Sequence, residues 1–238
     1  MQRKHNFIQG EFYHIYSRGN NKQGIFLDDK DRERFIKSLY VYNSFKNINF
    51  RSDIIEKKIE AWDFDRGEQL VSIGAWVLMP NHFHMYITPK LNLRTDDDTL
   101  SKFMQKVLTS YSKYFNKKYE RTGGLFEGTF NSVHMATDEQ TKYLFSYIHL
   151  NPVKLIDSQW KENGIQNKKE TIVLLENYRW SSYQDYKGFE RPELKILSRE
   201  EFPEYFKNTS DFDNEIISWL EYGDEPIFNS APKLNLGA

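Results

Sequence analysis

Near the middle of the chain lies the stretch Ile73-Gly74-Ala75-Trp76-Val77-Leu78-Met79-Pro80-Asn81-His82-Phe83-His84. Its apolar part has no polar face, which is typical of a strand that is buried on both sides of a sheet. The Pro80-Asn81 corner predicts a turn, so we expect a hairpin with a second strand over residues 82–88. Because strand side chains alternate, His82 and His84 should share one face while Phe83 enters the opposite layer.

The remaining periodic segments complete a familiar order of elements. We expect strands over residues 12–17, 70–79, 82–88 and 131–136, and helices over residues 28–45, 100–118 and 137–151. The order strand, helix, strand, strand, helix, strand, helix is typical of an α+β fold of the ferredoxin-like, split βαβ type. We therefore expect an antiparallel sheet with helices packed on it.

Domain organisation and composition point to an ordinary cytoplasmic protein. We expect a main domain over residues 1–154 and a mainly helical extension over residues 155–238, packed on it and ending in an acidic tail. Cysteine is absent, which excludes disulfides and cysteine-based zinc sites and fits a reducing cytoplasm. No apolar run reaches the length of a membrane span, so no membrane partner is expected.

The charge is unevenly distributed along the chain. Its net value of −1 argues against nucleic acid as a partner, but residues 201–238 carry eight acidic residues against two lysines, which leaves an excess of positive charge on residues 1–200. A basic stripe follows one predicted helix and its end: Lys102, Lys106, Lys113, Lys117, Lys118 and Arg121. Tyrosines and a phenylalanine are interleaved with it. The stripe fits a helix that follows phosphates, and it fits equally a solvated helix face.

A His-x-His pair becomes a metal site only if a third ligand comes from elsewhere; otherwise the two residues are hydrogen-bonded surface histidines. Residues four apart share a helix face, so Tyr143, Tyr147 and Asn151 form one stripe. The Asn151 oxygen would complete the site, with the Tyr147 phenol beside it. The alternative for such a stripe is core packing.

An acidic run and the remaining histidines are further candidates for metal ligands. The acidic run Asp96-Asp97-Asp98 directly precedes a predicted helix, and helix capping explains it better than metal binding. His14 lies on the first predicted strand, where it either approaches the face of the two histidines or makes a structural hydrogen bond. His149 points away from the tyrosine stripe, and His134 has no partner that the sequence identifies.

The donor set suggests phosphate chemistry. A tyrosine hydroxyl is a weak nucleophile at neutral pH because its pKa is about 10. A divalent cation polarises a phosphodiester and neutralises developing charge. Tyrosine attack then stores the energy of the broken bond in a covalent phosphotyrosine. Two imidazoles and an amide oxygen would suit Mg²⁺ or Mn²⁺.

At this point the sequence resembles a known family. His82-Phe83-His84 is similar to the HUH motif (His, hydrophobic, His) of single-tyrosine nucleases and transposases. With Met79-Pro80-Asn81 before it and Tyr147-Ile148-His149-Leu150-Asn151-Pro152-Val153-Lys154 after it, the chain resembles the REP-associated tyrosine transposases, relatives of bacterial insertion-sequence transposases. The likeness extends over roughly residues 10–190, and includes 18–26, 111–116, 124–128 and 179–183.

The resemblance implies a metal-dependent, single-strand DNA endonuclease and strand transferase that cleaves near hairpins. Tyr147 would be the nucleophile, forming a 5′-phosphotyrosine and freeing a 3′-OH. His82, His84 and Asn151 would bind the metal, with Asn151 where relatives often have Gln. The partner would be single-stranded DNA with a hairpin, and the protein would act as a monomer or a homodimer.

The end of the first strand offers further DNA contacts: Arg18, Asn20, Asn21 and Lys22. Two other functions stay open on the sequence. One is a domesticated nucleic-acid-binding protein that kept the fold and lost catalysis. The other is an unrelated metallohydrolase in which water, rather than Tyr147, attacks.

Overall fold

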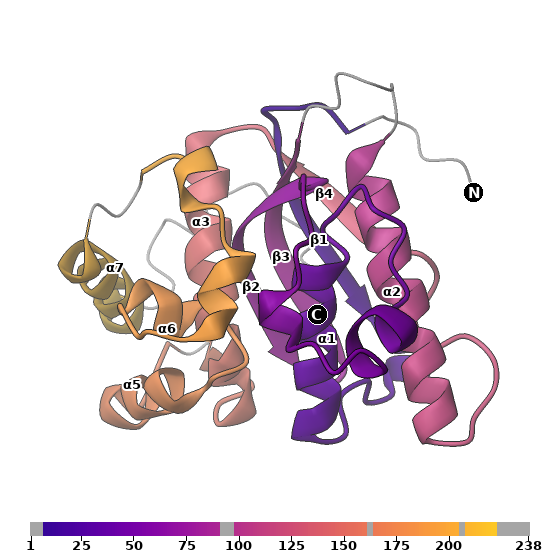
Figure 1. Ribbon diagram of the computed structural model, residues 1–238. Helices are drawn as coiled ribbons and strands as arrows, with labels where there is room; N and C mark the ends of the chain where they lie inside the picture. The colour runs from indigo at the N-terminus through magenta and orange to yellow at the C-terminus, as the bar shows by residue number, and fades with distance from the viewer. Residues whose placement is uncertain (1–6, 91–97, 161–163, 205–207, 223–238) are drawn as a thin grey trace.

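The structure is a computed structural model that describes residues 7–90, 98–160, 164–204 and 208–222. Its centre is a four-stranded antiparallel sheet with the order β2-β3-β1-β4 (Figure 1). The strands are β1 (Phe12–Arg18), β2 (Val71–Met79), β3 (His82–Pro89) and β4 (Asn131–Met135). β3 lies between β1 and β2, and β1 between β3 and β4, which is the predicted split βαβ arrangement.

The longer helices follow the predicted order. They are α1 (Asp29–Val41), α2 (Thr99–Lys118), α3 (Asp138–Leu150), α5 (Lys168–Asn177), α6 (Tyr183–Tyr186) and α7 (Thr209–Tyr222). Short helical turns are η1 (Asn20–Lys22), η2 (Arg51–Ile55), η3 (Ala61–Asp63), η4 (Asn151–Leu155), η5 (Pro192–Ile196) and η6 (Arg199–Glu201). Among the described residues, no helix is long and apolar enough to cross a membrane.

Capping residues fix where these helices begin. Asp28 accepts from the N–H of Asp31, and Asp98 accepts from the N–H of Ser101, as expected for helix caps. The rest of the acidic run lies outside the described residues. α1 ends four residues before the predicted position, because the Asn43 carboxamide turns to the backbone of Leu70 and Val71.

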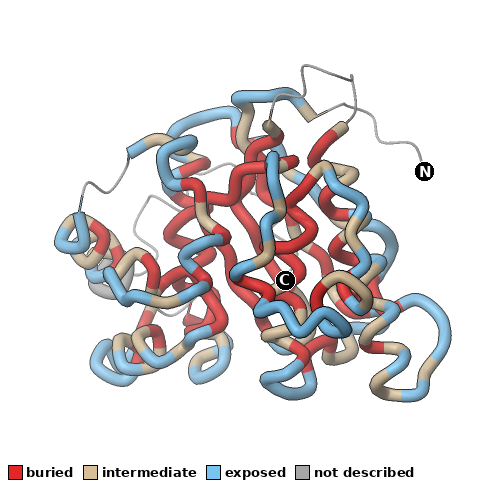
Figure 2. Tube along the Cα trace, viewed as in Figure 1, coloured by how far each residue is buried: buried red, intermediate tan, exposed pale blue. Residues whose placement is uncertain are grey.

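The two faces of the sheet have different covers. α1 and α2 pack on one face, in a core with Trp76, Phe83 and Ile15. α3 packs on the other face, in a second core with Val77 and Tyr86. Figure 2 shows the central strands of the sheet buried between these helical layers, whereas most of β4, at the edge, is exposed. A register shift between Ile73 and Ala75 sets which side chains of β2 enter which core.

The C-terminal part of the chain protects the edge of β2 that β3 leaves open. The Leu78 N–H donates to the Trp180 carbonyl at 2.8 Å, and the Ser182 N–H donates to the Trp76 carbonyl at 2.9 Å. Farther along the edge, the Ser198 N–H donates to the Ile73 carbonyl. An open strand edge invites pairing with other chains, so this cover stabilises the sheet and guards against aggregation. The division at residue 154 stays a prediction.

His149, near the end of α3, links this helix to the segment that covers the β2 edge. The sequence placed it outside the candidate site, and the structure gives it hydrogen bonds to Phe145 and Ser182. It is fully buried, donates from Nδ1 to the Phe145 carbonyl at 2.9 Å and accepts at Nε2 from the Ser182 hydroxyl at 2.8 Å. The Nδ1 bond suits either charge state of the ring, whereas the acceptor role of Nε2 needs the neutral imidazole. Burial, with a smaller contribution from the Arg199 charge, lowers the pKa of His149 to about 3.

Acid should therefore destabilise the fold through His149. The pKa of His149 in the unfolded chain is about 6.5. Between pH 6.5 and 3 the unfolded chain therefore binds a proton at His149 and the folded chain does not. The contribution of His149 is complete above pH ~6.5 and falls by up to about 1.4 kcal/mol per pH unit as the pH drops toward 3. Urea unfolding at pH 7, 6 and 5 measures this slope. His149→Gln should flatten it by about one proton; an equal slope in both proteins would contradict the assignment.

Candidate functional site

His82 and His84 lie at the start of β3 on the face covered by α3. His82 pairs with Arg18 of β1 and His84 with Tyr16. Phe83 points to the opposite layer, where its ring lies 5.0 Å from that of Phe35. The alternation of strand side chains therefore places both imidazoles together, as the sequence predicts.

His14 reaches this face from the neighbouring strand. Its Nε2 lies 2.8 Å from Nδ1 of His84, and both residues are fully buried. Both alternatives for His14 are observed together, because it approaches the paired histidines through a hydrogen bond to His84. His134, for which the sequence suggested no partner, contacts Glu11 at 2.6 Å on the edge strand.

Tyr147 and Asn151 come to the same place from α3 and the first position of η4. The Tyr147 ring meets that of His84 edge-on, with 5.4 Å between centroids, and stacks with Tyr143 one turn earlier. Tyr147 is 3% exposed, and Asn151 and His84 are fully buried. The structure thus brings together His82, His84, Tyr147 and Asn151 on one buried face.

The electrostatic environment makes both key groups neutral at pH 7. Burial, with help from the Lys154 and Arg18 charges, lowers the pKa of His82 to about 4, although contact with Asn151 opposes this. Burial raises the pKa of Tyr147 to about 12, while Asn151 and Arg18 act to lower it. The imidazole therefore keeps a lone pair available to a cation, and the phenol keeps its proton.

Asn151 lies between the imidazole and the phenol. Contact with Asn151 opposes the effect of burial at both groups, because it raises the pKa of His82 and lowers that of Tyr147. These contacts are loose. Nε2 of His82 and both polar atoms of Asn151 are buried without a well-formed hydrogen bond among the described residues.

The donor chemistry fits a divalent cation in part. Buried polar atoms without good partners are costly, and a cation with its water would satisfy them. In the described ranges, no three or more His, Cys, Asp or Glu side chains gather as a metal site. A cation here would thus need the Asn151 oxygen as its third protein ligand, with phosphate or water oxygens completing its shell.

Lys154 is a site residue that sequence reasoning missed. Its Nζ lies 5.9 Å from the centre of the Tyr147 ring, and its charge acts on His82. The signal was present, because Lys154 lies three positions beyond Asn151 on the same helical stripe. Asn81 was also missed: its Oδ1 lies 2.6 Å from Nδ1 of His82.

The predicted contacts at the end of β1 border this site. Asn20, Asn21 and Lys22 are exposed in η1, directly after Arg18. The Asn20 N–H donates to the Leu125 carbonyl, and Arg121 donates to the Gln23 side chain, so Arg121 joins the same edge. Gly19 is needed here, because a Cβ would lie 2.3 Å from the Gln23 carbonyl oxygen.

The five α2 lysines of the basic stripe lie on the other side of the sheet, where Lys118 pairs with Asp28 and Asp31. Lys106 donates to the carbonyls of Ser44 and Lys46, whereas Lys113 and Lys117 are exposed. Lys106, Lys113 and Lys117 line an open groove of about 630 Å³ that also contains Arg34. Lys102 lies on the same helix, half-buried. The stripe is thus separate from the His82 face, apart from Arg121.

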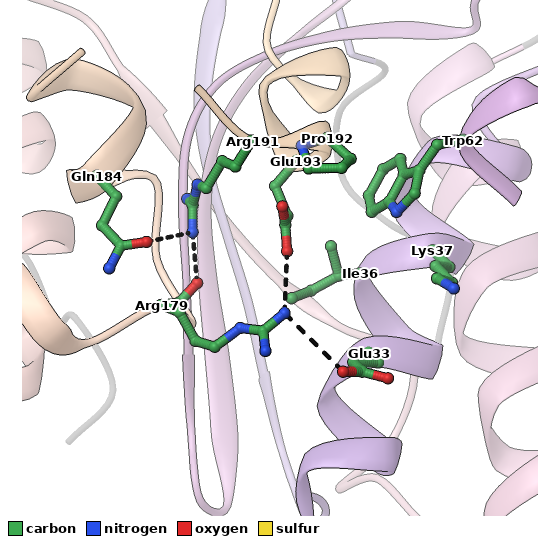
Figure 3. Close-up of a pocket in the computed structure, with 9 residues that line it drawn as sticks. All are labelled: Glu33, Ile36, Lys37, Trp62, Arg179, Gln184, Arg191, Pro192 and Glu193. Atoms are coloured by element: carbon green, nitrogen blue, oxygen red, sulfur yellow. Dashed lines mark hydrogen bonds and ion pairs between the residues drawn. The ribbon is translucent and has the colours of Figure 1, made fainter. Parts of the chain in front are cut away.

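A second pocket, of about 430 Å³, lies between α1 and the C-terminal part of the chain (Figure 3). Its charged groups are paired with one another: Arg179 with Glu33 and Glu193, and Arg191 with the buried Asp185. Charges satisfied in this way hold the two parts of the chain together. The pocket lies on the α1 side of the sheet, on the face opposite to that of His82.

Comparison with known proteins finds likeness in structure only. No protein-family model and no curated protein matches the sequence. One similar solved structure is that of a REP-associated tyrosine transposase bound to a REP hairpin, with a TM-score of 0.46 and 15% identity over 81% of this chain and 90% of that chain. Another is a bacterial tRNA(His) guanylyltransferase-like protein in complex with ATP, with a TM-score of 0.36 and 10% identity over 73% of this chain and 72% of that chain. At such identities the likeness concerns the backbone alone, and no residue role is taken from either protein.

Proposed function

We propose that this protein is a metal-dependent single-strand DNA endonuclease and strand transferase of the HUH type, a transposase that cleaves near hairpins. One observation carries the proposal. His82 and His84 from a strand meet Tyr147 and Asn151 from a later helical segment on one buried face. The resemblance of the ordered sequence motifs to those of REP-associated tyrosine transposases supports the same reaction.

Tyr147 is the nucleophile in this proposal. Its Oη attacks the phosphorus, the P–O3′ bond breaks, and the 3′ oxygen leaves as a 3′-OH. The phenol proton goes to solvent, and the leaving 3′ oxygen takes up a proton from solvent. The DNA on the 3′ side of the cut stays on the protein through its 5′ phosphate, as a phosphotyrosine. Asn151 and Arg18 favour the phenolate, because both lower the pKa of Tyr147 against the effect of burial.

His82, His84 and Asn151 would hold a Mg²⁺ or Mn²⁺ ion. Such an ion supplies Lewis-acid polarisation of the scissile phosphate and neutralises developing charge. The Tyr147 hydroxyl is buried in this structure. The DNA must therefore displace neighbouring side chains to reach it, and the half-buried Lys154 is the flexible cation nearest the ring.

Two surfaces are proposed to contact the DNA. Arg18, Asn20, Asn21, Lys22 and Arg121 border the cleavage site. The α2 groove, on the far side of the sheet, would take a phosphate backbone through Lys102, Lys106, Lys113 and Lys117. Arg34 supports this second contact: it is half-buried over the Phe50 ring and hydrogen-bonded to Ser110, with no carboxylate partner in the described part of the chain.

Removing two groove lysines tests the second contact. Lys113→Ala with Lys117→Ala should weaken binding of hairpin DNA and reduce the slope of log K against log [salt] by about 2, one for each lost phosphate contact. Fluorescence anisotropy over a series of salt concentrations measures the slope. Lys57→Ala with Lys58→Ala serves as the control, because it also removes two exposed lysines, neither of which lines the groove. An unchanged slope in the groove variant would identify these lysines as a solvated face.

The reaction itself is tested with 3′-labelled single-stranded DNA that contains a hairpin. We expect a labelled protein adduct on a denaturing gel with Mg²⁺ or Mn²⁺, and none with EDTA. Metal-dependent cutting without an adduct would favour the metallohydrolase. Tight binding without cutting would favour the domesticated binding protein. Either result would overturn the proposal.

A further inference from the structure

Asn81 is placed to act on two parts of the candidate site at once. Its Oδ1 lies 2.6 Å from Nδ1 of His82, and its Nδ2 donates to the Lys22 carbonyl at 3.1 Å. A carbonyl oxygen only accepts, so the second contact fixes which end of the amide is NH₂. The amide oxygen must then face His82.

This orientation decides where the His82 proton lies. The amide oxygen also only accepts, so Nδ1 of His82 must carry the hydrogen that joins them. In the neutral imidazole the lone pair is then on Nε2, which is buried without a well-formed hydrogen bond among the described residues.

The loop of residues 19–26, which contains Lys22, has a backbone conformation that presents the Lys22 carbonyl to Asn81. Asn21 and Lys22 have φ of 53° and 59°, in the left-handed region that non-glycine residues seldom adopt. The Gly19 N–H donates to the Asn81 carbonyl, and the Ile25 N–H to that of Pro80. The loop that would carry DNA contacts is thus hydrogen-bonded to the residue beside His82.

We propose that Asn81 is a positioning residue that holds His82 in its Nδ1–H tautomer and ties that tautomer to the loop of residues 19–26. The benefit for metal binding rests on the proposed function, but the tautomer does not. Partners behind a ligating histidine fix its ring and raise its basicity, and losing one typically weakens metal binding 10–100-fold.

Long-range ¹H–¹⁵N correlation spectra of the ¹⁵N-labelled full chain, without metal at pH 7, test the proposal. The imidazole signals of His82 are identified as those that disappear in the spectrum of His82→Gln. Wild type should show the Nδ1–H tautomer. Asn81→Ala should lose it, in favour of the Nε2–H form or a mixture. Asn81→Asp should keep it, because a carboxylate still accepts from Nδ1 but no longer donates to Lys22.

A titration with Mn²⁺, followed by its EPR signal, gives a second readout. Asn81→Ala should weaken binding by about 10–100-fold, and Asn81→Asp should restore it. An Nε2–H tautomer in wild type, or an unchanged tautomer in Asn81→Ala, would overturn the proposal; if Asn81→Ala does not fold, wild type and Asn81→Asp decide. The His82 tautomer could respond to the variants as expected while the protein binds no Mn²⁺. That result would support the role of Asn81 and contradict the proposed metal site.

Discussion

Tyr147→Phe should abolish the covalent DNA adduct and reduce strand cleavage by roughly 10³-fold or more, as expected when a nucleophile is removed. The substitution deletes one oxygen and keeps the ring that packs against His84. Stability should therefore change little, and DNA binding should persist. A quenched time course with end-labelled hairpin DNA measures the loss.

Tyr143→Phe is the matched control for this experiment. Tyr143 lies one turn earlier on the same helical stripe, and its ring stacks on that of Tyr147 with 6.2 Å between centroids. The same atom is removed from the same helix, so the control should retain adduct formation. Equal activity in both variants would rule out Tyr147 as the nucleophile.

Arg191→Ala should cost about 3–5 kcal/mol of unfolding free energy, because it leaves a buried carboxylate without its partner. Arg191 contacts both oxygens of Asp185, at 2.9 and 2.6 Å, and the Asp185 side chain has no exposed surface. The same guanidinium holds the Arg179 carbonyl and the Gln184 side chain (Figure 3). Urea unfolding measures the loss.

Two further variants separate this ion pair from its surroundings. Arg179→Ala, in the same pocket but half-exposed, should cost about 1 kcal/mol or less. Arg191→Met combined with Asp185→Leu should recover most of the lost stability, since it removes both charges together. A small effect of Arg191→Ala alone would show that Asp185 is easily solvated or protonated in the fold.

Local periodicity was enough to predict the two residue pairs that make up the candidate site. A period of two placed His82 and His84 on one face of β3, and a spacing of four aligned Tyr147 with Asn151. That these faces meet follows from the split βαβ order. Right-handed crossovers put α1 and α2 on one face, which leaves the other for a helix that follows β4.

Features that depend on long-range contacts could not be predicted in this way. The pairing of residues 178–198 with the edge of β2 leaves no periodic signal, because irregular backbone makes it. The contact of Asn81 with Lys22 joins residues 59 positions apart. The sequence also does not show that the α2 lysines lie across the sheet from His82, because this follows from the packing of α2 and α3 on opposite faces.

The most direct test of the central claim is to identify the covalent linkage. Hairpin DNA labelled at its 5′ end and, in a parallel sample, at its 3′ end is incubated with the full chain and Mg²⁺ or Mn²⁺. The adduct is then digested and sequenced by tandem mass spectrometry. The proposed mechanism predicts that only the 3′ label stays with the protein, through a phosphate on Tyr147. A linkage to any other residue, or retention of the 5′ label, would contradict it.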